Sequence, residues 1–149
     1  MHLGPKFKVS FRADKPFPPH KLEVDYFEVT VIEGDDKATT AIGFCSEFAN
    51  LAVSLGGHRH FSIAYHSDDG YIYEGIEAER PHKPVELCEV FGKQQTVGCG
   101  VDWDTKEVFF TLNGELQSGF ISCLIFYIVM SKDRLRVSLI VLVLTLPQS

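Results

Sequence analysis

Several features typical of secreted and nucleic-acid-binding proteins are missing from this sequence. The first residues contain no apolar run of the kind that opens a secretory signal. The 14 Lys and Arg residues are scattered and the formal net charge is −6, so no basic cluster is present to neutralise phosphates. We therefore expect an intracellular, cytoplasmic protein that binds no nucleic acid.

Cysteine is sparse. The chain has 4 cysteines in 149 residues, at positions 45, 88, 99 and 123. Four cysteines could form two disulfides in a secreted protein, but there is neither a secretory signal nor a dense cysteine framework. We expect reduced thiols packed among apolar neighbours.

Helical periodicity and long apolar runs are also missing. No window longer than a turn or two places apolar residues on one face of a helix. The two longest apolar runs, residues 120–130 and 137–146, span about ten residues each, whereas a membrane helix needs roughly 20. We expect no membrane span and interpret these runs as buried strands.

What the sequence does contain is enough apolar material for one core. Hydrophobic residues make up 45% and aromatic residues 12% of the chain, including 12 Phe. A chain of this length supports one domain, so residues 1–149 are expected to form a single unit. Short alternating runs predict strands at residues 22–32, 39–45, 61–65, 71–73, 96–103 and 108–112.

Turn residues separate these strands. Asp69-Gly70 and Asn113-Gly114 tolerate positive φ, so each predicts a tight hairpin turn. Prolines 81 and 84 predict an exposed loop over residues 76–90, because proline cannot donate to a sheet ladder. Within residues 22–32 the apolar residues change parity, which predicts a bulge or two abutting strands.

A series of short motifs is spaced along residues 7–117. The segments are 9–13, 16–19, 26–29 (Tyr-Phe-Glu-Val), 42–44 (Ile-Gly-Phe), 64–70 (Ala-Tyr-His-Ser-Asp-Asp-Gly), 97–102 (Val-Gly-Cys-Gly-Val-Asp) and 108–114 (Val-Phe-Phe-Thr-Leu-Asn-Gly). In this order the motifs resemble the SPRY domain family, and within it the branch of adaptors typified by Ran-binding proteins. The resemblance implies a bent, jelly-roll-like antiparallel β-sandwich. It also implies that loops at one end of the sandwich hold a peptide or a folded partner, as in adaptors and substrate-recognition units.

The chain departs from the family pattern in two places. Residues 55–60 replace the usual Pro-Gly-Trp loop, so an aromatic anchor is missing there. Residues 118–149 form an apolar tail without the family's closing-strand motifs. Either the two apolar runs of the tail supply the closing strands, the last one near residues 134–139, or the tail exposes an aggregation-prone edge and the chain is a truncated product without independent function.

Loop residues of the family-like part are the candidate partner contacts. They mix aromatic surface with charge and lie in or beside connecting segments, where binding residues concentrate. The alternative is that they are surface residues around a hairpin with no role in binding. The candidates are Arg59, Tyr65, His66, Asp68 and Tyr73.

Residues capable of catalysis or metal binding have simpler explanations. His58, His60 and His66 with Asp68 and Asp69 match no closed zinc set, and a polar turn accounts for them, so we expect no metal and no cofactor.

Three acids, Asp102, Asp104 and Glu107, could serve a carbohydrate-binding or glycoside-cleaving sandwich, but they flank a predicted β-turn, where solvated acids are common. Cys45 and Cys99 lie in apolar strand runs, which favours inert thiols over nucleophiles. We expect a binding protein and not an enzyme, with the carbohydrate function as the alternative.

Overall fold

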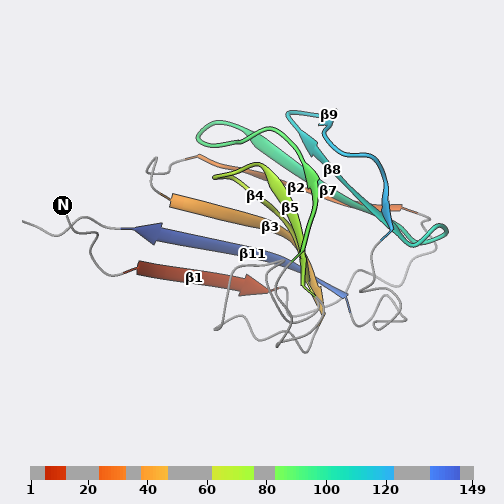
Figure 1. Ribbon diagram of the computed structural model, residues 1–149, viewed down its shortest axis with the longest axis horizontal. Coiled ribbons are helices and arrows are strands. Elements are labelled where there is room, and N and C mark those ends of the chain that lie inside the picture. Colours follow the sequence, from red (N-terminus) through yellow and green to blue (C-terminus); the bar gives the residue numbers. More distant parts are fainter. Residues whose placement is uncertain are drawn as a thin grey trace, which may run out of the picture.

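The computed structural model describes residues 6–12, 24–32, 38–46, 62–75, 83–122 and 135–144. Every regular element among these residues is a strand, and the strands form two antiparallel sheets (Figure 1). This confirms the all-β sandwich expected from the alternating pattern. In the described part of the chain, no helix is long and apolar enough to cross a membrane.

The larger sheet, called sheet A here, has six strands. Its order is β1-β11-β3-β4-β5-β6, and each neighbouring pair is antiparallel. The strands are β1 (Lys6–Arg12), β11 (Leu135–Leu144), β3 (Ala38–Ser46), β4 (Ser62–His66), β5 (Tyr71–Gly75) and β6 (Lys83–Leu87).

The second sheet, sheet B, has the order β10-β8-β7-β2, and the short strand β9 also pairs with β8. The expected hairpin of residues 96–112 is confirmed as β7 and β8. The strands are β2 (Val24–Thr30), β7 (Thr96–Asp102), β8 (Glu107–Leu112), β9 (Glu115–Leu116) and β10 (Ile121–Ser122).

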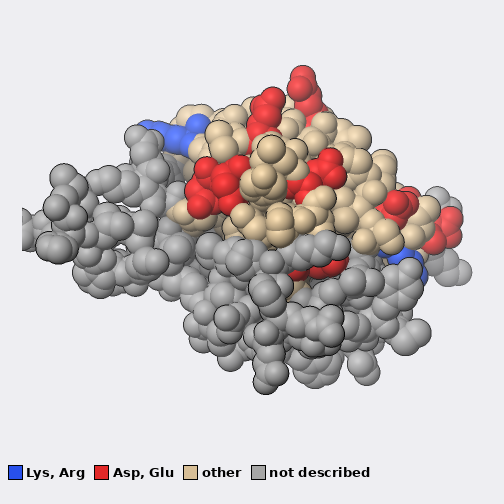
Figure 2. All heavy atoms as spheres, viewed as in Figure 1, with Lys and Arg blue, Asp and Glu red and all other residues tan. Residues whose placement is uncertain are grey.

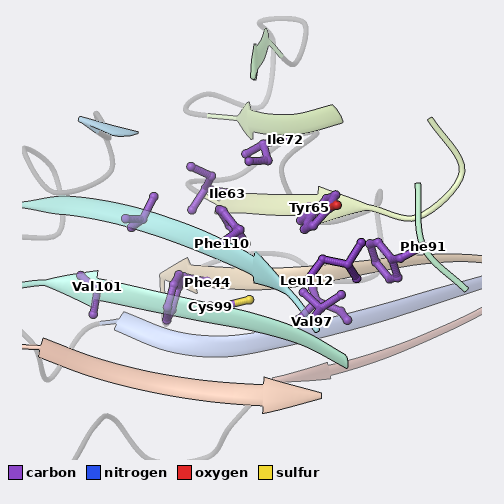
Figure 3. Packing of buried hydrophobic residues seen from close by; sticks show 12 residues of the cluster. Phe44, Ile63, Tyr65, Ile72, Phe91, Val97, Cys99, Val101, Phe110 and Leu112 are labelled. Atoms are coloured by element: carbon purple, nitrogen blue, oxygen red, sulfur yellow. The ribbon is translucent and has the colours of Figure 1, made fainter. Parts of the chain in front are cut away.

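Alternate residues of the two sheets meet in one core (Figure 3). On β7, for example, Val97, Cys99 and Val101 are all buried, as their spacing of two predicts. Each fully buried aliphatic or aromatic side chain contributes roughly 1.5–3 kcal/mol relative to exposure. The core consists of Ile42, Phe44, Ile63, Tyr65, Ile72, Phe91, Val97, Cys99, Val101, Val108, Phe110 and Leu112.

The C-terminal strand β11 lies between β1 and β3 and pairs with both (Figure 1). Ser138 is in register with Arg12 on one side and with Gly43 on the other. Part of the apolar tail is therefore a strand of sheet A, as the first of the two alternatives predicts. From the earlier apolar run, Ile121–Ser122 form β10 beside β8, while residues 123–134 lie outside the described residues.

The prediction of an exposed loop over residues 76–90 is wrong at Lys83–Leu87, which form β6. Pro84 is tolerated because β6 is an edge strand of sheet A, where a missing donor can face away from the ladder. The β5–β6 register also shifts between Ile72 and Tyr73.

The expected bulge in residues 22–32 is also absent from the described part of that segment. β2 pairs with β7 without interruption from Val24 to Thr30. Val24 and Tyr26 are exposed, whereas Asp25 is buried and accepts a 2.7 Å hydrogen bond from Trp103 Nε1. The parity change thus reflects apolar residues on the outer face of sheet B and one buried carboxylate on its inner side.

Candidate functional site

The turn that joins β4 to β5 is organised by its own residues. Asp69 accepts hydrogen bonds from the Tyr71 main-chain N–H through Oδ1, at 2.9 Å, and from the Tyr73 hydroxyl through Oδ2. Gly70 has a φ of 76°, and a Cβ there would collide with the main-chain oxygen of Cys88. Glycine is therefore required at this position for both conformation and space.

Neighbouring segments hold the turn from two sides. On one side Thr40 N donates to Ser67 Oγ at 2.8 Å and Ser67 N donates to Thr40 O at 2.9 Å. On the other side Cys88 N donates to Gly70 O at 2.8 Å, and the hydroxyl of Tyr65 donates to the main-chain oxygen of Glu89. The turn is thus fixed between β3 and the segment that follows β6.

The structure describes four of the five candidate contact residues, and it places them in different surroundings. Tyr65 is fully buried, with its ring 4.8 Å from that of Phe91, so it belongs to the core and not to a loop surface. His66 is only 2% exposed and its ring centroid lies 4.5 Å from that of Tyr73. Asp68 is exposed and Tyr73 is half-buried. Arg59 lies outside the described residues.

Other exposed residues beside the turn were missed by the sequence analysis. Leu87, 61% exposed, is in register with the half-buried Tyr71, whose ring lies 5.9 Å from that of Tyr73. The sequence signal for Leu87 was an apolar residue within residues 76–90, the segment predicted to be an exposed loop. We call Asp68, Tyr71, Tyr73 and Leu87 the turn surface.

Figure 2 shows the charged side chains on one face of the molecule. Acidic side chains are spread over the described part of this face, and basic side chains appear there at two separate places.

Burial sets the protonation of the groups around the turn. Desolvation, together with the hydrogen bond to Asp69, raises the pKa of Tyr73 well above its ordinary value, so the hydroxyl stays protonated and donates. Desolvation, with the nearby Glu86 charge, raises the pKa of Cys88 to about 11. Burial raises the pKa of Cys99 as well. Both thiols are therefore neutral at physiological pH, which agrees with the expectation of inert, packed cysteines.

Three side chains at the turn have ligand atoms within 4.8 Å of one another: His66, Asp68 and Asp69. Such groups can bind a metal. However, both oxygens of Asp69 already accept hydrogen bonds that shape the turn. The turn itself thus explains the position of Asp69, and His58 and His60, which completed the histidine group in the sequence, lie outside the described residues.

The acids considered for carbohydrate chemistry lie at the β7–β8 turn. Asp102 Oδ1 accepts hydrogen bonds from Asp104 N at 2.9 Å and from Thr105 N at 3.2 Å. This is the pattern of an aspartate that stabilises its own turn. Asp102 is also in register with Glu107 across the hairpin. A carbohydrate function at these acids stays a prediction, and no contact described here favours it.

Comparison with known proteins identifies the family. A SPRY domain model matches residues 24–130. The chain is 36% identical over 105 residues to a Ran-binding protein M homolog of Arabidopsis thaliana, covering 70% of this chain and 21% of that protein. It is 30% identical over 102 residues to SPRY domain-containing protein 3 of Homo sapiens, covering 65% and 22% respectively. The chain thus matches about a fifth of the length of each of these relatives.

Solved structures agree with this assignment. A human SPRY domain crystal structure superposes with a TM-score of 0.68 at 22% identity, covering 95% of this chain and 86% of that one. The SPRY domain of human HERC1 superposes with a TM-score of 0.60 at 11% identity, covering 98% and 86%. Sequence motifs, family model and fold coincide, and the chain belongs to the SPRY domain family.

Proposed function

We propose that this chain is the recognition unit of a cytoplasmic adaptor and that it holds a peptide or a folded protein against the turn surface. SPRY domains are generally protein–protein interaction modules, which supports the class of function. The choice of site rests on the hydrogen bonds that hold the β4–β5 turn to its neighbouring segments. Its main chain is fixed from two sides while Asp68 and Leu87 remain exposed.

A surface that is ordered before binding loses little conformational freedom when the partner arrives. The Asp69 carboxylate fixes the Tyr73 hydroxyl, and the His66 ring packs against the Tyr73 ring. Tyrosine contributes strongly to interfaces because it offers a large rigid surface with a polar tip. In this proposal Tyr73 and Tyr71 supply that surface, and Leu87 extends it with apolar area.

The other candidate residues have different parts in the proposal. Asp68 provides an exposed carboxylate for a donor or cation on the partner. His66 positions Tyr73, and Tyr65 holds the segment after β6 in place through Glu89. Arg59, which precedes β4 in the sequence, is retained as a contact on the basis of its residue type alone.

A peptide-display selection on the immobilised full chain tests the proposal. The affinity of each selected peptide is then measured by calorimetry for the wild type, Asp68→Ala and Tyr73→Ala. We expect each substitution to weaken binding about tenfold or more, as at an interface hot spot. Asp104→Ala, an exposed aspartate in the β7–β8 turn, is the matched control and should bind as the wild type does.

Two results would overturn the proposal. One is a selection that yields no saturable ligand. The other is a set of ligands that bind Asp68→Ala and Tyr73→Ala as tightly as the wild type, provided that both variants melt cooperatively.

A further inference from the structure

The outer face of sheet B carries a row of aromatic side chains that do not belong to the core. Tyr26 on β2 is in register with Gly100 on β7, and Gly100 is in register with Phe109 on β8. Phe120 directly precedes Ile121 of β10, which pairs with Val108, so Phe120 continues the row past β8. We call Tyr26, Phe109 and Phe120 the aromatic strip.

Glycines on β7 make room for the strip. A Cβ on Gly100 would collide with the Phe109 ring, and a Cβ on Gly98 would collide with the hydroxyl of Tyr26. The Tyr26 and Phe109 rings therefore extend over β7, with centroids 6.0 Å apart and planes within 11° of parallel. Phe120 adds a third ring 5.1 Å from Phe109. The result is a continuous aromatic surface that crosses β2, β7 and β8 and ends beside β10.

This surface is open to solvent. Tyr26 is 42% exposed and Phe120 is 52% exposed. Val24 and Leu116, which border the strip on β2 and β9, are exposed as well. Contiguous exposed apolar surface is uncommon on a soluble domain and often marks an interaction site.

Acidic side chains border the strip on both sides. Glu28 lies two residues beyond Tyr26 on the same side of β2. In the row on the other side of the strip, Asp102 and Glu107 stand directly opposite one another. Like charges facing each other across a ladder are destabilising, and a cation placed between them would relieve this repulsion. Lys106 in the adjoining turn is the one nearby basic residue in the described part of that hairpin.

The strip is held in place from within. The Tyr26 hydroxyl donates to Glu28 Oε1 at 2.9 Å, and the Thr111 hydroxyl donates to the Tyr26 oxygen at 2.7 Å. The Tyr26 hydroxyl is thereby fixed over Gly98 by hydrogen bonds to Glu28 and Thr111. The ring orientation is therefore set before any partner binds.

We infer that the aromatic strip is a second binding surface, whose occupant is an arginine-bearing basic segment of a partner protein. An arginine guanidinium can stack on an aromatic ring while it donates to a neighbouring carboxylate, which is the combination this face offers. Lysine shares the charge but not the planar group. This inference uses residues separate from the turn surface and does not depend on the proposed function.

The size of the strip suggests the probe. It runs from β2 to β10 across three strand spacings, roughly 14 Å in all. A five-residue extended peptide has about this length. We choose acetyl-Gly-Arg-Ser-Arg-Gly-amide and two matched peptides in which both arginines are replaced by lysine or by citrulline.

The test is a titration of the isotope-labelled full chain followed by NMR. With the arginine peptide we expect saturable shifts at the amides of Gly98, Gly100 and Phe109, and affinity that falls as salt increases. The lysine peptide should bind about threefold more weakly and the citrulline peptide at least about tenfold more weakly.

Variants separate the contributions of rings and charges. Phe120→Leu and Phe109→Leu keep an apolar side chain. Each should lower the affinity for the arginine peptide about threefold, to about the affinity that the wild type has for the lysine peptide. The double variant Glu28→Gln, Glu107→Gln should lower the affinity for the arginine peptide about tenfold at low salt. Glu89→Gln removes the charge of an exposed glutamate that belongs to neither the aromatic strip nor the turn surface, and it should leave the affinity unchanged.

Several outcomes would overturn the inference. They are shifts at residues 67–73 in place of β7 and β8, equal affinity for the arginine and citrulline peptides, and equal affinity for the arginine and lysine peptides. Loss of affinity in Glu89→Gln equal to that in the acidic double variant would also contradict it. A wild-type dimer in sedimentation that Phe120→Leu converts to a monomer would mean that a second copy of this chain occupies the strip instead.

Discussion

The Tyr65 hydroxyl donates a hydrogen bond to the main-chain oxygen of Glu89, and this bond joins the core to the segment behind the turn surface. Tyr65→Phe keeps the ring against Phe91 but removes the bond. We expect a loss of about 1 kcal/mol in the free energy of unfolding, together with faster amide exchange at Phe91.

Tyr65→Ala tests the core assignment of the same residue. Removing the ring from a fully buried site should cost about 3–5 kcal/mol. Any loss of binding in this variant should therefore follow from loss of folded protein. A thermal melt within about 2 °C of the wild type would contradict burial of Tyr65, since 1 kcal/mol corresponds to at least that shift in a domain of this size.

Two glycines offer a matched pair for the geometry of the turn. Gly70→Ala places a Cβ against the oxygen of Cys88 at a φ of 76°, so we expect destabilisation by more than about 1 kcal/mol. A Cβ on Gly92 has no neighbouring atom within 4 Å, so Gly92→Ala should change the free energy of unfolding by less than about 1 kcal/mol. Urea melts of both variants measure the difference, and equal stability of the two would refute the described turn.

The raised pKa of Cys88 predicts a pH dependence. The thiol binds its proton more tightly in the folded chain, with a pKa of about 11 against 9.0 for the unfolded group. Its contribution to stability is therefore complete below pH 9 and lost as the pH rises toward 11. Unfolding free energies measured from pH 8 to 11 should fall less steeply in Cys88→Ala than in the wild type. Parallel curves would contradict the desolvation of this half-buried thiol.

Strand β11 predicts the effect of shortening the chain. Because β11 pairs with both β1 and β3, a chain that ends at residue 134 leaves those two strands without their shared partner. We expect it to lose the cooperative thermal transition and to aggregate through exposed strand edges. A chain that ends at residue 144 keeps β11 and is the control. Cooperative melting of both would show that the tail is dispensable.

Local patterns in the sequence predicted much of the sandwich. The alternation of Val97, Cys99 and Val101 marked a core strand, and both Asp-Gly and Asn-Gly turns formed, with Gly70 and Gly114 at positive φ. Turn chemistry and side-chain alternation act over a few residues, so a single sequence reveals them. The insertion of β11 between β1 and β3 involves residues far apart in the chain, and the tail gave only an apolar run as a signal.

The candidate site was predicted less completely for the same reason. Tyr65 was assigned to a surface because it adjoins a polar turn, but Phe91 and Phe110 cover it from other elements. Leu87 was overlooked because Pro84 suggested a loop, although an edge strand accommodates proline. Which face of a strand is covered depends on the opposite sheet, and alternation along one strand does not contain that information.

The measurement that tests the central proposal most directly is the location of a selected partner peptide on the full chain. Backbone amide shifts should concentrate at Asp68, Tyr71, Tyr73 and Leu87 when a display-selected peptide is titrated into labelled protein. Shifts at these positions at saturation, absent with a scrambled peptide, are the result that the account predicts. Saturable binding with shifts confined to other parts of the sandwich would contradict the turn surface as the recognition site.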